Sequence, residues 1–245
     1  MIRLIPLIVL CLAVLAHALI PGQAVQAAPG GQSNPTDARA QCALLAGEGA
    51  IEICQQAARE HPGNLAVQRD LARSLIAFGD FEAAVEVYQR IAEARPDDVR
   101  AQADLGGSLG FIRRYAEAVA PMERAMQLQP DNVGHYRAGA VVFAQLGRMA
   151  DAVRVTLMAA HLGDAISMHD LVGHYREGVG VAADPAQAMA WAERAAERGH
   201  LGALELMVRV YVDGLLGQAP DPAKAGEWAS KFRRAQLSGD GPVQR

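Results

Sequence analysis

Aromatic residues are scarce in this chain of 245 residues: phenylalanine, tyrosine and tryptophan together make up 5% of it. The sequence is nevertheless 51% apolar, and alanine supplies much of that fraction. Small apolar side chains suit close packing between helices better than the core of a β-rich domain. The shortage of large rings therefore favours an all-α fold.

An excess of charge of one sign is also missing. The formal net charge is −4, and acidic and basic residues alternate along the chain instead of forming blocks. Binding to nucleic acid or to an anionic membrane depends on a concentrated positive surface. The composition therefore gives no reason to expect either of them as a partner.

Motifs of catalysis are missing as well. The sequence has no HExxH, and no nucleophile elbow is predicted between a strand and a helix. Gly178-Val-Gly180 resembles a phosphate-binding loop, but no Lys-Ser/Thr follows it. We therefore predict a protein that is not an enzyme and holds no cofactor or metal.

The N-terminal segment has the pattern of a signal peptide. Arg3 precedes an apolar run from Leu4 to Ile20, Pro21-Gly22 breaks it, and Val25-Gln26-Ala27 offers small residues to a peptidase. We predict that residues 1–27 are a signal peptide cut after Ala27, and that the mature chain is periplasmic or secreted. An uncleaved anchor stays open as the alternative, although the run is slightly short for a membrane span.

Cysteine is nearly absent, with three residues in all. Cys11 lies inside the predicted signal peptide, which leaves Cys42 and Cys54 in the mature chain. In an oxidising compartment such a pair predicts a disulfide across a helix–turn–helix. A reactive thiol and a metal pair remain as alternatives, but the spacing is not that of a CxxC motif.

The most informative feature present is a period of 34 residues. It is marked by prolines in turns and by two ladders of small or apolar residues, namely Pro62, Pro96 and Pro130; Ala50, Ala84, Ala118 and Ala152; and Ala57, Ile91, Ala125 and Ala159. A fixed period of this length indicates stacked helix–turn–helix units. We predict an all-α solenoid of about six stacked helical hairpins.

The period divides the mature chain. Residues 28–35 are expected to be a flexible N-terminus, residues 36–163 four units with a degenerate first one, and residues 240–245 a disordered tail. Between them, residues 164–239 form two longer units, because Tyr175 recurs as Tyr211 and Trp191 as Trp228, 36 and 37 residues later. The recurrence assigns both tryptophans to packing. Pro121 lies within a predicted helix, where a kink is expected.

The 34-residue units resemble the tetratricopeptide repeat, most closely at residues 65–98 and 99–132. Residues 164–239 resemble the Sel-like repeat, through Tyr175, Gly178, Gly180, Asp184, Ala188, Trp191, Ala195, Ala196 and Gly199. Both resemblances imply a right-handed solenoid that binds a protein or peptide on its concave face. Neither implies an enzyme.

The first helix of each unit lines that face in tetratricopeptide repeats. By period and resemblance the outward residues there include Arg69, Arg73, Arg100, Phe111 and Arg137, which we take as candidate partner-binding residues. Arginine binds carboxylates in a bidentate manner, so an acidic segment is a plausible ligand. The alternative is that these arginines are solvated or pair with acids such as Asp70 and Asp104.

We therefore predict an exported bacterial scaffold that holds a protein or peptide in an envelope assembly or secretion complex. The alternative is a periplasmic module that binds a small molecule or copper. It would use the histidines and methionines of residues 158–174, which are Met158, His161, Met168, His169 and His174. Methionine at apolar helix positions is also a common core residue.

Overall fold

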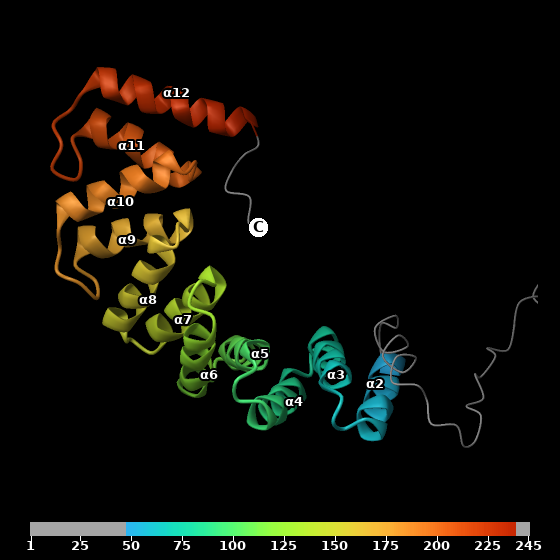
Figure 1. Cartoon of the computed structure of the whole chain (residues 1–245). Coiled ribbons are helices and arrows are strands. Elements are labelled where there is room, and N and C mark those ends of the chain that lie inside the picture. The colour runs from blue at the N-terminus through green and yellow to red at the C-terminus, as the bar shows by residue number, and fades with distance from the viewer. Residues whose placement is uncertain (1–47, 239–245) are drawn as a thin grey trace, which may run out of the picture. The chain divides into compact units, whose positions relative to one another are not determined.

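The computed structural model describes residues 48–238, which form eleven helices and no strand (Figure 1). The helices are α2 (Glu48–Glu60), α3 (Leu65–Phe78), α4 (Phe81–Ala94), α5 (Val99–Phe111), α6 (Tyr115–Leu128), α7 (Val133–Gln145), α8 (Met149–His161), α9 (Ala165–Glu177), α10 (Pro185–Glu197), α11 (Leu201–Asp213) and α12 (Pro222–Ser238). Each helix packs against the next one in the chain. The prediction of an all-α fold built from stacked hairpins is confirmed.

The helices pair into five complete hairpins, α3–α4, α5–α6, α7–α8, α9–α10 and α11–α12. α2 precedes them and packs on α3. It occupies the place of the second helix in the degenerate first unit. The partner helix expected before it, the predicted signal peptide, the flexible N-terminus and the tail lie outside the described residues.

The first helix of every hairpin begins at a side chain that caps it. The caps are Asn64, Asp98, Asn132, Asp164 and His200, and each accepts a hydrogen bond from an amide of the first turn. Such a bond satisfies a donor that has no partner within the helix. The caps recur after 34, 34, 32 and 36 residues, so the change of period predicted near Gly163 is visible as a change in cap spacing.

The predicted ladders lie in the core. Ala84, Ala118 and Ala152 on the second helices are at most 2% exposed, and Ile91, Ala125 and Ala159 are equally buried. Small side chains at these positions let neighbouring helices approach closely. Trp191 and Trp228 are 3% and 7% exposed, which confirms their assignment to packing.

Buried apolar residues form two clusters, one made by α2 to α8 and the other by α8 to α12. α8 belongs to both of them. Ala152, Val155 and Ala159 pack in the first cluster, whereas Val153 and Ala160 pack in the second. The 34-residue units therefore pass into the longer units through a shared helix.

Pro121 lies inside α6, which continues past it to Leu128, and its side chain is buried.

Gly180 lies close to the start of α8. Its φ is 77°, and a Cβ there would lie 2.4 Å from the carbonyl oxygen of Met149. The Gly178-Val-Gly180 segment thus turns closely over the start of α8, which supports the interpretation that the repeat explains these glycines.

Candidate functional site

Arg69 is largely enclosed between two hairpins. Its side chain is 14% exposed, and Nη2 donates a hydrogen bond of 2.7 Å to Oδ2 of Asp98, the cap of α5. Its Nε lies 3.8 Å from Oδ2 of Asp104, six residues further along the chain in α5. The arginine therefore joins α3 to the next hairpin, as the alternative interpretation of the sequence considered.

The pKa values of the two aspartates beside Arg69 are shifted in opposite directions. Burial tends to raise the pKa of Asp98, but the hydrogen bonds from Arg69 and the Ala101 amide bring it below its ordinary value. For Asp104, burial outweighs the nearby arginines, and its pKa is raised. The hydrogen bond to Asp98 is thus the stronger contact of the pair.

The other candidates on α3 and α5 are exposed. Arg73 is 58% exposed and its Nη1 lies 3.3 Å from Oδ1 of Asp70. Arg100 lies exposed in the first turn of α5, and no ion pair joins it to any residue of the described range. Phe111 ends α5 with 67% of its surface exposed, and its ring lies 4.6 Å from that of Phe81. Arg73, Arg100 and Phe111 are therefore available to a partner.

Arg137 lies in a groove between α7 and α9, the first helices of consecutive hairpins. The groove has a volume of about 740 Å³, and α8 forms its floor through Ala152 and Thr156. Val141, which is 58% exposed, contributes an apolar wall. Asp170 and His174 project from α9 on the opposite side. Of the predicted binding residues, Arg137 alone lines this groove.

The polar groups of the groove are only partly engaged. Arg137 is 42% exposed and its Nε lies 4.0 Å from Oδ2 of Asp164, the cap of α9. His174 makes a contact of 2.8 Å between Nδ1 and the carbonyl oxygen of Val179. Burial raises the pKa of Asp170, an effect that His169 and other nearby groups oppose. Sequence reasoning missed Asp170, because no local motif marks it.

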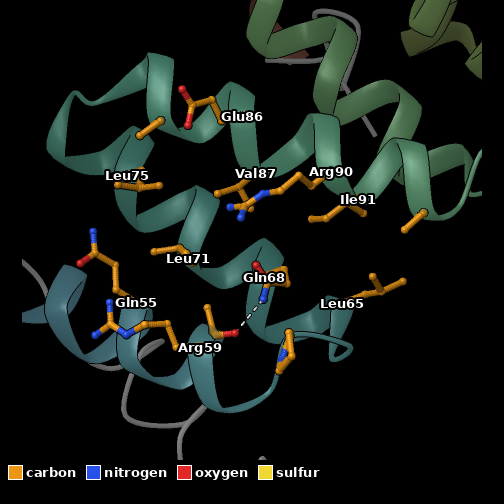
Figure 2. Close-up of a pocket in the computed structure, with 14 residues that line it drawn as sticks. Gln55, Arg59, Leu65, Gln68, Leu71, Leu75, Glu86, Val87, Arg90 and Ile91 are labelled. Carbon is orange, nitrogen blue, oxygen red and sulfur yellow. Dashed lines mark hydrogen bonds between the residues drawn. The ribbon is translucent and has the colours of Figure 1, made fainter.

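A second type of groove opens between successive second helices. One of about 510 Å³ lies between α2 and α4 over α3, and Figure 2 shows Leu71 and Leu75 in it, together with the hydrogen bond from Gln68 to the Ala58 carbonyl. Another of about 440 Å³ lies one repeat later, where Gln102 takes the place of Gln68. The two grooves recur with the period, so the packing of the repeats accounts for them.

The histidines of residues 158–174 have separate neighbours. The ring of His161 lies edge-on to Trp191 at 5.6 Å, and that of His169 stacks on His200 at 4.5 Å. Met168 is buried, whereas Met158 is 45% exposed. Across residues 48–238 no three His, Cys, Asp or Glu side chains are placed to hold a metal ion.

Residues 106–110, Gly-Gly-Ser-Leu-Gly, have the G-x-S-x-G spacing of a nucleophile elbow, which sequence reasoning passed over. They lie within α5, where the motif would require a turn from a strand into a helix. Gly106 instead gives room to Met122, since a Cβ there would lie 2.9 Å from its side chain. The spacing is thus explained by helix packing.

Cys54 is fully buried in α2, with its Sγ 3.3 Å from Oγ of Ser74. Cys42 lies outside the described residues, so the disulfide stays a prediction.

None of the helices within residues 48–238 is long and apolar enough to span a bilayer.

Comparison with known proteins agrees with this geometry. Residues 46–105 match the family model of the tetratricopeptide repeat. Across 84% of this chain and 87% of the other, the fold is similar to that of a Sel1 repeat protein from Oxalobacter formigenes, with 22% identity and a TM-score of 0.53.

Two structures of MamA are similar as well. One has 17% identity and a TM-score of 0.54 over 61% of this chain and 86% of that one. The other, MamA from residue 41 to its end from Desulfovibrio magneticus RS-1, has 18% identity and a TM-score of 0.52 over 65% and 84%. No curated protein matches the sequence. The chain is therefore an all-α helical-repeat protein in which residues 46–105 match the tetratricopeptide repeat, with a fold similar to that of a Sel1 repeat protein.

Proposed function

We propose that this protein is an exported, non-catalytic scaffold that binds a protein or peptide on the face formed by α3, α5, α7 and α9. Solenoids of tetratricopeptide and Sel1-like repeats generally mediate interactions between proteins, and they do so along extended surfaces. A preformed surface lowers the cost of ordering a bound segment. The complex that it serves would be one of envelope assembly or secretion.

The observation that carries the proposal is the groove between α7 and α9. Its 740 Å³ falls within the range of about 300–1,000 Å³ common for binding pockets. Val141 is 58% exposed on its wall, so a partner's apolar side chain would remove that surface from water. Charged groups on both sides would orient the partner.

An acidic segment is the partner chemistry that the arginines suggest. Arg73, Arg100 and Arg137 have exposed side chains, which supports their availability to carboxylates. Arg69 is held by Asp98, so we leave it out of the binding set. Phe111 would add apolar contact at the end of α5.

Site-specific photocrosslinking tests the choice of face. A crosslinking amino acid at Val141 or Gly107 should trap a partner in the cells that make the protein, and Arg73→Glu with Arg100→Glu should abolish the product. Glu86 and Arg90, exposed on the second-helix side, provide control positions. Crosslinks from the control positions alone would refute the proposed face.

Export is tested separately. Mass spectrometry of the protein recovered from an envelope fraction should find a mature chain that begins at Ala28. A product that retains residues 1–27 would instead favour the anchor alternative.

A further inference from the structure

One arrangement of three charged residues occurs twice along the first helices. An arginine stands five residues after a helix cap, and two aspartates stand at the next first-helix cap and six residues beyond it. The first copy is Arg69, Asp98 and Asp104, and the second is Arg137, Asp164 and Asp170.

The first copy is closed. Arg69 is 14% exposed, and it contacts Oδ2 of Asp98 at 2.7 Å and Oδ2 of Asp104 at 3.8 Å. The aspartate six residues beyond the cap thus has a guanidinium beside it. The first copy therefore shows that a guanidinium group can lie beside an aspartate at this position of the helix.

The second copy is open. The amide and Oγ of Ser167 both donate to the same carboxylate oxygen of Asp164, at 2.9 Å and 2.6 Å. In the first copy the Ala101 amide binds one oxygen of Asp98 and Arg69 binds the other. No hydrogen bond within residues 48–238 joins Arg137 to Asp164 in the way that Arg69 is joined to Asp98.

The result is an aspartate without a direct partner. Arg137 comes no nearer than 4.0 Å to Asp164, and Asp170 makes no hydrogen bond or ion pair within the described part of the chain. Asp170 is exposed at the edge of the groove. A carboxylate there that has no hydrogen-bonded cation can accept one from a partner.

The charged residues around the groove also favour a positively charged partner group. Its lining contains one arginine, Arg137, and two carboxylates, Asp170 and Glu177, of which Glu177 binds Arg176. The carboxylate of Asp164 lies at the same edge. An arginine or lysine of a partner would therefore be better matched here than an acidic side chain.

We propose that the groove between α7 and α9 binds a partner segment that places an arginine or lysine at Asp170 and an adjacent apolar side chain against Val141. This inference rests on the proposed function and specifies the partner at this one groove. It differs from the acidic segment suggested by the arginines, and the two are separated by experiment.

The test is an NMR titration of the purified, isotope-labelled protein with three capped peptides, acetyl-Leu-Arg-Leu-amide, acetyl-Leu-citrulline-Leu-amide and acetyl-Leu-Glu-Leu-amide. We expect the arginine peptide to shift the amides of Val141 and Gly173 and to bind about tenfold more tightly than the citrulline peptide. Asp170→Asn should remove this preference. Asp131→Asn, which makes the same change of charge at an exposed turn between α6 and α7, should keep it.

Several results would overturn the inference: equal binding of the arginine and citrulline peptides, tighter binding of the glutamate peptide, or no shift around the groove with any of them. Each would leave the proposed function standing if Val141 still gives crosslinks. Loss of those crosslinks would refute the binding face itself.

Discussion

Arg69 of α3 and Asp98 at the start of α5 are joined by a hydrogen bond of 2.7 Å that crosses from one hairpin to the next. The contact spans 29 residues of sequence and is mostly shielded from water. Helical repeats gain stability from such interfaces between neighbouring units. It therefore adds a polar link to the apolar contacts between the α3–α4 and α5–α6 hairpins.

Arg69→Ala should lower the free energy of unfolding by about 1–3 kcal/mol, because it leaves Asp98 and Asp104 without their cation. Urea denaturation measures the loss. Arg124→Ala is the control, since Arg124 also pairs with an aspartate, Asp97 in the turn before α5, but both side chains are exposed. Its cost should stay within about 0–1 kcal/mol. Equal costs for the two variants would contradict the structural role of Arg69.

The stability of the last hairpin should depend on pH through His200. Its Nδ1 accepts a hydrogen bond of 3.1 Å from the Ala203 amide, where the other first helices have Asn or Asp as the cap. Burial lowers the pKa of His200, and the stacked His169 lowers it further while Asp164 opposes this. The unfolded chain therefore binds the proton more readily, and stability should fall as the pH drops below the ordinary histidine pKa of about 6.5.

His200→Asn preserves a capping acceptor that does not titrate in this range, so it should flatten the pH dependence of unfolding between pH 7 and pH 5. Loss of the cap in the unmodified protein is worth about 0.5–2 kcal/mol. Burial also lowers the pKa of His135. This histidine therefore contributes to the pH dependence of unfolding in both the unmodified protein and the His200→Asn variant. The difference between the two slopes thus isolates His200, and identical slopes would disprove its role.

Gly180→Ala should be strongly destabilising, by about 2 kcal/mol or more, because the new Cβ meets the Met149 carbonyl oxygen and the backbone has positive φ. Gly226→Ala provides the opposite control. Gly226 lies inside α12 with no atom within 4 Å of an added Cβ, and alanine should add up to about 1 kcal/mol of stability. Thermal unfolding followed by circular dichroism distinguishes the two. A mild effect at Gly180 would show that the turn can move away from α8.

The sequence was most informative where local patterns decide the structure. The period placed unit boundaries at residues 65 and 99, where α3 and α5 begin, and it located the buried ladder through Ala118, because these features repeat within one unit. The engagement of Arg69 depends on aspartates about 30 residues further along the chain, so sequence alone left it between ligand binding and pairing. Asp170 escaped notice, because its place in the groove depends on α7, one unit earlier in the chain.

α8 has one side fitted to the 34-residue units and the other to the longer ones. Such a helix acts as an adapter between two kinds of module. Whole hairpins can be gained or lost by duplication on either side of it while the opposite interface keeps its shape. The protein can therefore change its length during evolution, and can be lengthened by design, without the junction being rebuilt.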